Sequence, residues 1–308
     1  MIETKNSLQC TIIGAGAMGC LFASMLHKND IKVHLLENNT NIIKLAENGI
    51  TIKDNDQETS YKIPITSDLD IIKESTIIIV FVKSFSTESL LKTIKPYIDS
   101  KAIIVSLQNG LLHSKLFQEY IPEDQYILGS TTYGASSPSP GKVILGGIGT
   151  VVYGGRNSEA KNLLSKIFTQ CNIDHSITDD ALPVLWEKAL INSAINPIAA
   201  ILKITNGQII ENLYARNLQK SILREAVQAA KLAGYSIEYD YIYQRVIDVC
   251  KKTSSNRCSM LQDQSNNRRT EIDSINGFFL NIGEQSNQSF PVNNTIVQLI
   301  KAREVYLS

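Results

Sequence analysis

Two patterns of apolar and polar positions follow one another along the chain and meet near residue 180. From residue 8 to residue 180, short runs rich in isoleucine and valine alternate with stretches of helical periodicity. Such alternation predicts a doubly wound α/β domain with a mainly parallel sheet. Beyond residue 181 the strand-like runs give way to helical patterns. We therefore predict an α/β domain over residues 1–180 and an all-α domain over residues 181–308.

The bounds of the elements follow from the same pattern. The expected strands cover residues 8–16, 32–37, 75–84, 101–110, 126–135 and 149–155. The expected helices of the first domain cover residues 17–29, 40–49, 86–98 and 158–171. Residues 136–150 are rich in serine, proline and glycine, which indicates a hairpin at a domain edge. In the second domain we expect helices over residues 182–201, 212–234, 239–252, 270–286 and 293–307, with a polar loop and a short helix within 251–270.

A glycine motif lies between the first expected strand and the first expected helix. The stretch TIIGAGAMG has the GxGxxG spacing, in the strand–turn–helix context that dinucleotide binding requires. In such a motif the first glycine allows a tight turn, the second lets the backbone approach a pyrophosphate, and the third lets the helix pack on the strand. A glycine turn without a ligand is the alternative. The expected phosphate-binding residues are Gly14, Ala15, Gly16, Ala17, Met18 and Gly19.

An acidic residue ends the second expected strand. Glu37 lies eighteen residues after Gly19, where a carboxylate can bind the 2′-hydroxyl of the NAD ribose and would repel a 2′-phosphate. A solvated surface glutamate is the alternative. Lys83 and Asn109 follow two later strands at their carboxyl ends, where ligands gather in such sheets. Both are candidate ligand-binding residues, although a surface lysine and an Asn-Gly turn are also common at strand ends.

The expected helix over residues 182–201 is apolar on most sides but carries a polar stripe. Lys188, Asn192 and Asn196 are spaced four residues apart, so they share one face. A buried ammonium is costly unless it is paired, and desolvation lowers its pKa toward the range useful for proton transfer. The alternative is a lysine whose stem lies along the core while its charge reaches water. A polar cavity with a small polar ligand would satisfy all three side chains. Pro197 is expected to interrupt this helix, and Asn206 with Gly207 to stop it.

A third polar motif precedes the expected helix at 270–286. Ser259 lies in the polar run, and Thr270 followed by Asp273 resembles a capping box. Glu271 would then lie in the first helical turn, where the helix dipole stabilises an anion. A surface glutamate that does no more than complement the dipole is the alternative.

Composition narrows the function classes. Thirty basic residues balance thirty acidic ones, which gives no overall electrostatic reason to bind nucleic acid or an anionic membrane. The five cysteines include no CxxC pair and the four histidines form no ligand pattern, so we expect neither a disulfide framework nor a metal site. The first ten residues contain no apolar signal core, and the apolar helix carries charged and amide side chains. A cytoplasmic location is therefore expected.

Together these motifs resemble those of the 2-dehydropantoate 2-reductase (ketopantoate reductase) family. The stretches GAGAMG, LQNG, GSTTYGA, WEKALINSAINP and SSNRCSMLQDQSNNRRTEIDSINGF occur in the order of that family. The resemblance implies a Rossmann-type N-terminal domain and an α-helical C-terminal domain like that of 6-phosphogluconate dehydrogenases, with the active site between them. The implied reaction is the reduction of ketopantoate to pantoate, on the way to pantothenate and coenzyme A.

The resemblance also assigns roles to single residues. It implies Lys188 as the proton donor and Glu271 as a group at the junction of cofactor and substrate. Lys83, Asn109 and Ala135 match cofactor-contacting positions. The positions that match substrate-binding residues are Asn109, Asn192, Asn196, Asn206 and Ser259.

The residues after the second expected strand and the resemblance to the family lead to different expectations about NADH and NADPH. The family usually uses NADPH and carries an arginine after the second strand, whereas this chain has Glu37 and Asn38 there. We therefore expect NADH to be accepted or preferred. A reductase of the same architecture for another 2-oxo or β-hydroxy acid remains an alternative, and so does a non-catalytic dinucleotide sensor. The chain is expected to act as a monomer or homodimer on a small molecule.

Overall fold

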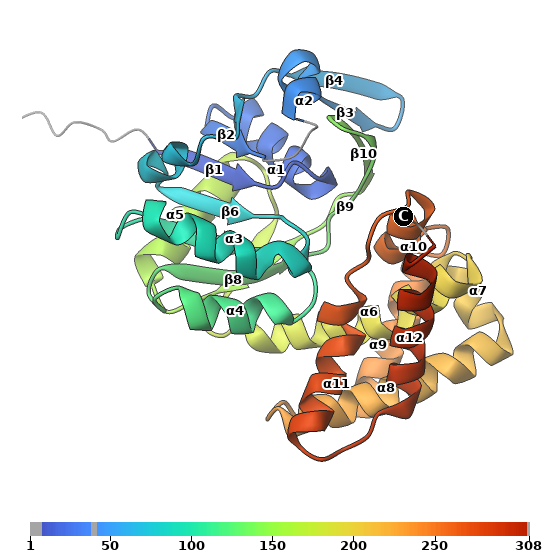
Figure 1. The fold of residues 1–308 in the computed structure, drawn as a ribbon. Coiled ribbons are helices and arrows are strands. Elements are labelled where there is room, and N and C mark those ends of the chain that lie inside the picture. The colour runs from blue at the N-terminus through green and yellow to red at the C-terminus, as the bar shows by residue number, and fades with distance from the viewer. Residues whose placement is uncertain (1–7, 38–41, 307–308) are drawn as a thin grey trace, which may run out of the picture. The chain divides into compact units, whose positions relative to one another are not determined.

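The chain divides into two compact units in the computed structural model (Figure 1). One unit comprises Met1–Gln108 and His113–Ala181, and the other comprises Asn109–Leu112 and Leu182–Ser308. The structure describes residues 8–37 and 42–306. The second unit thus consists of the C-terminal part of the chain and the four residues Asn109–Leu112, which are flanked on both sides by residues of the first unit.

The first unit is built on an eight-stranded sheet whose order is β12-β11-β8-β7-β6-β1-β2-β5. The strands β5, β2, β1, β6, β7 and β8 are parallel, β11 is antiparallel to β8, and β12 is parallel to β11. The central strands are buried along their whole length, which explains their unbroken apolar sequences. The strands are β1 (Gln9–Ile13), β2 (Lys32–Leu36), β5 (Ile65–Thr66), β6 (Ile77–Val80), β7 (Ile103–Ser106), β8 (Tyr126–Thr131), β11 (Val151–Gly154) and β12 (His175–Thr178).

Helices connect the strands of this sheet. They are α1 (Ala17–Lys28), α2 (Ile42–Asn48), α3 (Thr87–Ile94), α4 (Leu112–Tyr120) and α5 (Ser158–Gln170). Short 3-10 turns are η1 (Leu69–Glu74), η2 (Ser84–Ser86) and η3 (Lys95–Tyr97). Phe22 on α1 and Phe168 on α5 meet edge to face, and the ring of Tyr153 lies at 84° to that of Phe168. These rings belong to the core that fixes the helices on the sheet.

A second, four-stranded sheet has the order β4-β3-β10-β9. Its members are β3 (Ile50–Asp54), β4 (Gln57–Tyr61), β9 (Gly134–Ser139) and β10 (Lys142–Gly147). The β9–β10 hairpin confirms the hairpin expected from the serine, proline and glycine content of this region. The β3–β4 hairpin was not expected, although Asn55, with φ 52°, lies in the turn between its strands. It joins β10 through parallel pairing, a contact between distant parts of the sequence.

The described part of the second unit contains helices and no strand. They are α6 (Leu182–Leu202), α7 (Asn206–Glu211), α8 (Leu213–Leu232), α9 (Tyr239–Lys252), α10 (Ser259–Ser265), the 3-10 turn η4 (Ile272–Ser274), α11 (Asn276–Gln285) and α12 (Pro291–Glu304). The nearly all-apolar α6 is the central helix, since it packs on α7, α8, α9, α10 and α12. Trp186 on α6 stacks on Phe279 of α11, with 6.0 Å between ring centroids.

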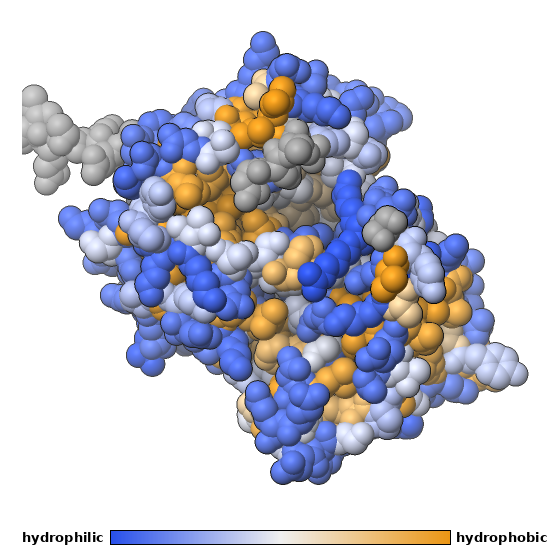
Figure 2. All heavy atoms as spheres, in the orientation of Figure 1, coloured by the Kyte–Doolittle hydropathy of each residue, from blue (hydrophilic) through white to orange (hydrophobic). Residues whose placement is uncertain are grey.

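The architecture confirms a Rossmann-type α/β domain followed by an all-α domain. On the face shown in Figure 2, hydrophilic residues predominate and apolar residues form separate patches. No helix within the described residues is long and apolar enough to cross a bilayer.

Candidate active site

The glycine loop between β1 and α1 has the backbone geometry of a ligand cradle. Gly14 has φ +102°, and a Cβ there would lie 2.9 Å from the backbone nitrogen of Val82. A Cβ on Gly19 would collide with the carbonyl oxygen of Gly14, so this position must stay bare for α1 to pack on the loop. A Cβ on Gly16, by contrast, would meet no atom within 4 Å. Gly16 therefore leaves open space in front of the backbone, as the approach of a pyrophosphate requires.

The start of α1 presents backbone N–H groups that have no acceptor within the helix. Ala17 and Met18 form its first turn, and both are half-buried. The first N–H groups of a helix have no partner within the helix and attract anions. No acidic residue occupies this first turn. The loop and the helix start together fit a dinucleotide phosphate.

Glu37 is held against the glycine loop. It follows β2, and its carboxylate accepts a hydrogen bond from the backbone N–H of Ala15 at 2.9 Å. The backbone N–H of Glu37 itself bonds the carbonyl of Thr66 at 3.0 Å. Glu37 is thus held through both its carboxylate and its backbone at the end of the second strand. Asn38, its neighbour in the sequence argument, lies outside the described residues.

The ends of β6 and β7 are joined by a buried glutamine that the sequence argument missed. Gln108 donates from Nε2 to the carbonyl of Val82 at 2.7 Å and to Oγ1 of Thr87 at 2.8 Å. Val82 directly precedes Lys83, and Gln108 directly precedes Asn109. The side-chain amide of Gln108 therefore holds together the two backbone segments that lead into Lys83 and Asn109. The signal in the sequence was a polar residue two positions beyond an apolar strand.

The loop after β7 is also fixed to the turn before α11. Gly110 has φ +82°, and a Cβ there would lie 2.5 Å from the carbonyl oxygen of Ser274. The N–H of Leu111 donates to that same oxygen at 3.0 Å. Asn109, just before this contact, is half-buried. Ala135 lies in β9, opposite Leu145, and is also half-buried.

Lys188 lies on α6 between the buried residues Trp186 and Ala189. Burial lowers the pKa of its ammonium to about 8, and the carboxylate of Glu271 opposes this by raising it. Glu271 itself is only 8% exposed. A lysine that exchanges its proton close to neutral pH suits general acid–base chemistry.

The two asparagines of the stripe follow Lys188 on α6. Asn196 is buried and Asn192 is half-buried. Pro197 does not end α6, which continues to Leu202, but it interrupts the hydrogen bonding inside the helix. The Ser193 carbonyl, which loses its helical partner to the proline, accepts a hydrogen bond from Nδ2 of Asn276 at 3.2 Å instead.

Asn206 does not end a helix as expected. Helix α6 ends earlier, where Lys203 adopts φ +57°, and Asn206 is the first residue of α7. Its amide nitrogen donates to Oγ1 of Thr253 at 2.9 Å, whose hydroxyl donates in turn to Val249. The side chain is buried and holds the end of α9 against the start of α7.

Ser259 is the exposed first residue of α10. The preceding Cys258 caps this helix, since its sulfur accepts from the N–H of Leu261 at 3.4 Å. The same thiol donates to the backbone carbonyl of Asn196 at 3.5 Å. Cys258, which the sequence argument passed over, thus links the serine's helix to the asparagine stripe.

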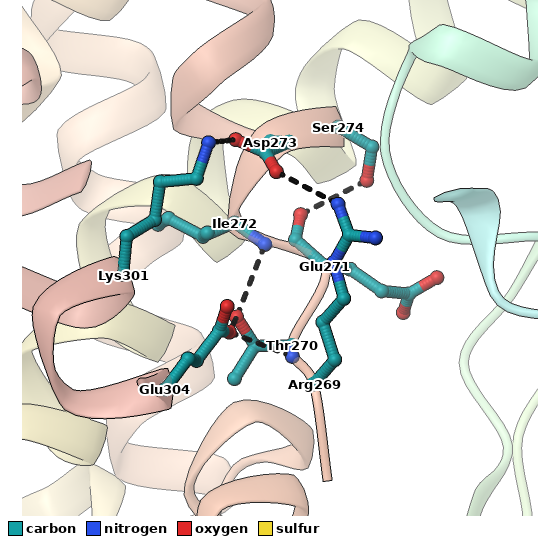
Figure 3. A network of polar contacts seen from close by, with 8 residues as sticks. All are labelled: Arg269, Thr270, Glu271, Ile272, Asp273, Ser274, Lys301 and Glu304. Carbon is teal, nitrogen blue, oxygen red and sulfur yellow. Dashed lines mark hydrogen bonds and ion pairs between the residues drawn. The ribbon is translucent and has the colours of Figure 1, made fainter. Parts of the chain in front are cut away.

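The turn that carries Glu271 is fixed by its neighbours (Figure 3). Thr270 donates to Glu304 through both its N–H, at 2.8 Å, and its hydroxyl, at 2.6 Å. Asp273 pairs with Lys301 at 2.7 Å, so the expected capping box between Thr270 and Asp273 is wrong. The hydroxyl of Thr270 accepts instead from the N–H of Ile272. Figure 3 shows the Glu271 carboxylate pointing away from the Asp273–Lys301 pair.

Glu271 accordingly does not lie inside a helical turn. It directly precedes η4, and α11 begins only at Asn276. The backbone that carries the carboxylate is held by the Thr270–Glu304 contact and by the hydroxyl of Ser274, which donates to the carbonyl of Glu271 at 2.9 Å. The described residues include no cluster of three or more histidine, cysteine or acidic side chains that could hold a metal ion.

Comparison with protein families matches both units. Residues 10–158 match the model of ketopantoate reductase PanE/ApbA, and residues 180–304 match the model of its C-terminal part. The chain is 31% identical over 302 residues to the 2-dehydropantoate 2-reductase of Streptococcus pyogenes serotype M3, covering 96% of this chain and 98% of that protein. It is 26% identical to the 2-dehydropantoate 2-reductase of Halobacterium salinarum, with the same coverage.

Solved structures show the same architecture over the whole length. A D-mandelate dehydrogenase in complex with NADH and anilino(oxo)acetate has a TM-score of 0.91 and 25% identity, covering 97% of this chain and 99% of that one. A PanE/ApbA family ketopantoate reductase from Ralstonia eutropha has a TM-score of 0.89 at 23% identity, with the same coverage.

Proposed function

The chain belongs to the ketopantoate reductase family, and from that premise we propose that it reduces the 2-oxo group of ketopantoate to the 2-hydroxyl of pantoate. Family membership makes it a nicotinamide-dependent oxidoreductase. The product would serve pantothenate and coenzyme A biosynthesis. The observation that carries the proposal is the half-buried Lys188, whose pKa is lowered to about 8 by desolvation, while the charge of Glu271 opposes that shift.

The chemical step that residues of this chain would carry out is the transfer of one proton to the substrate. A nicotinamide cofactor, when bound, supplies the hydride that C2 of the substrate receives. Lys188 gives its proton to the ketone oxygen as negative charge develops there, so a hydroxyl forms and a neutral amine remains. Glu271 keeps part of the lysine population protonated, because its carboxylate raises the pKa that burial has lowered.

Polar side chains of the helical unit would orient the substrate. Asn192 and Asn196 share the helical face of Lys188, and Ser259 lies at the start of a helix linked to Asn196 through Cys258. An amide or hydroxyl that bonds the substrate carboxylate or hydroxyl fixes the reacting carbon relative to the lysine. We propose Asn109, Asn192, Asn196, Asn206 and Ser259 as the substrate-binding residues.

The cofactor would be held mainly by the first unit. The fit rests on the open space beside Gly16 and on the first N–H groups of α1, which have no acceptor within the helix. We propose Gly14, Ala15, Gly16, Ala17, Met18, Gly19, Glu37, Lys83, Asn109, Ala135 and Glu271 as the cofactor-binding residues. Because the Glu37 carboxylate is fixed beside the loop, it favours the ribose diol of NADH over the 2′-phosphate of NADPH. We therefore propose that this protein accepts or prefers NADH, although the resemblance to the family implies NADPH as the usual cofactor.

A second substrate class has specific support. The D-mandelate dehydrogenase structure shares this fold over 97% of the chain and was solved with NADH. The alternative is therefore an NADH-dependent reductase of another 2-oxo acid, with an aromatic side chain. A non-catalytic dinucleotide sensor would have no use for a lysine with a lowered pKa beside a buried carboxylate.

The deciding experiment measures oxidation of the reduced cofactor by the purified protein. NADH and NADPH are each tested with ketopantoate, with phenylglyoxylate and with no ketoacid. The proposal expects the highest kcat/KM with ketopantoate. A higher value with phenylglyoxylate would establish the second class, and binding of the cofactor without turnover of any ketoacid would establish the sensor.

A further inference from the structure

Helix α6 contains a proline, and a side chain of another helix donates the hydrogen bond that this proline cannot donate. Pro197 has no N–H, so the carbonyl of Ser193, four residues earlier, has no donor within the helix. Nδ2 of Asn276, the first residue of α11, donates to this carbonyl at 3.2 Å. Ser193 and Asn276 are both fully buried, so the carbonyl is not open to bulk solvent. Asn276 therefore supplies a donor that α6 itself lacks.

A chain of hydrogen bonds fixes which way the Asn276 amide faces. Glu225 on α8 accepts from Nδ2 of Asn293 at 2.8 Å and from the N–H groups of Val292 and Asn293 at the start of α12. Because a carboxylate only accepts, Asn293 must turn its nitrogen toward Glu225. Its oxygen then faces Asn276 and accepts from Nδ2 at 3.0 Å. The two hydrogens of this Asn276 nitrogen thus serve Asn293 and Ser193.

This contact joins the two segments that carry the proposed chemistry. Ser193 directly follows Asn192 and lies five residues after Lys188 on α6. Asn276 lies five residues after Glu271, across the short turn η4. The hydrogen bond between Ser193 and Asn276 therefore sets how α6 lies against the turn that bears the carboxylate.

We propose that Asn276 is a positioning residue, which holds Lys188 and Asn192 in place relative to Glu271 by completing the proline-interrupted hydrogen bonding of α6. Asn276 needs no contact with substrate or cofactor in this role. The inference rests on the proposed function, since it concerns the same lysine and carboxylate. It adds a residue that neither the glycine motif nor the polar stripe includes.

The role predicts a coupling between positions 276 and 197. Asn276→Leu removes the donor at similar side-chain volume and leaves both the Ser193 carbonyl and Oδ1 of Asn293 without it, of which Pro197→Ala can repair only the first. Pro197→Ala restores a backbone N–H that can bond Ser193 within the helix. Asn276→Leu should therefore harm catalysis when Pro197 is present and much less when alanine replaces it.

The experiment is a double-mutant cycle that measures kcat, KM and the pH dependence of kcat, with thermal unfolding as a check of the fold. Asn276→Leu should lower kcat by about tenfold or more, since small displacements of a catalytic group are costly. It should also move the alkaline limb of the kcat profile to lower pH, because Glu271 then raises the pKa of Lys188 less. Asn281→Leu, the same change at an exposed position of α11, is the control and should change neither quantity.

Two outcomes would overturn the proposal. One is a folded Asn276→Leu protein with the wild-type kcat and pH profile. The other is an equal loss of kcat in the Pro197→Ala background. If Asn276→Leu alone does not fold, the variant that carries both Asn276→Leu and Pro197→Ala decides. A folded double variant with the kcat and pH profile of Pro197→Ala supports the role. An unfolded or inactive double variant refutes it.

The wild-type protein separates this inference from the proposed function. If it reduces another 2-oxo acid but not ketopantoate, the substrate assignment fails while the cycle can still be measured with that acid. If it reduces the substrate as proposed and the cycle shows no coupling, only the role of Asn276 fails.

Discussion

The carboxylate of Glu37 accepts a hydrogen bond from the backbone N–H of Ala15 at 2.9 Å, which fixes a negative charge beside the glycine loop. A ribose diol can donate to such a carboxylate, whereas a 2′-phosphate meets like charge there. We expect wild-type kcat/KM to be at least as high with NADH as with NADPH. Glu37→Ala should raise kcat/KM for NADPH and lower it for NADH.

The measurement is kcat/KM for both cofactors at saturating ketoacid. Glu47→Ala, which removes an exposed carboxylate on α2, is the matched control and should leave the cofactor ratio unchanged. A wild type that strongly prefers NADPH, with a ratio that Glu37→Ala does not alter, would show that Glu37 plays no part in the choice.

Lys188→Ala should lower kcat by a factor of about 10²–10⁴, as expected for the loss of a general acid. The protein should remain folded, because the change also removes a charge whose burial is unfavourable. Circular dichroism and steady-state kinetics check the two parts. Lys251→Ala, at an exposed position near the end of α9, should retain wild-type turnover. Near-normal kcat in folded Lys188→Ala would refute the proposed proton donor.

The pH dependence of reduction should follow the protonation of Lys188. Only the protonated amine can donate, and burial lowers its pKa from 10.5 to about 8. In the reduction direction kcat should therefore be high below pH 8 and fall as the pH rises through about 8. Glu271→Gln removes a charge that raises this pKa, so its alkaline limb should shift to lower pH. A profile that stays flat beyond pH 10 in the wild type would contradict the assignment.

Alanine substitution of Asn192, Asn196 or Ser259 should raise KM for the ketoacid and leave the dissociation constant of the cofactor nearly unchanged. Each lost hydrogen bond to the ligand should cost about 1–3 kcal/mol, which corresponds to a change in KM of about five- to 150-fold. Ser255→Ala, in the exposed loop before α10, is a suitable control for Ser259. Weaker cofactor binding together with an unchanged KM for the ketoacid would mean that these residues belong to the other ligand.

The local periodicity of the sequence was sufficient for much of the fold. Alternation of apolar strands and amphipathic helices predicted the α/β unit, and continuous helical periodicity predicted the second unit, because both patterns reflect contacts within single elements. The GxGxxG spacing likewise predicted the strand–loop–helix that the structure contains. Lys188, Asn192 and Asn196 could be placed on one face because helix geometry alone determines which residues share a face. Their roles stay predictions.

Tertiary structure decided the features that depend on residues far apart in the chain. The partners of Thr270 and Asp273 are Glu304 and Lys301 on α12, which lie about one-tenth of the chain away and replace the local capping box. The donor for the Ser193 carbonyl comes from Asn276, 83 residues later, and the amide that holds the ends of β6 and β7 comes from Gln108. A hydrogen bond between distant segments leaves no periodic trace in sequence, because it depends on how whole helices and strands pack. The chain alone therefore determined which chemical groups are available, and only packing determined which of them are paired and which way they face.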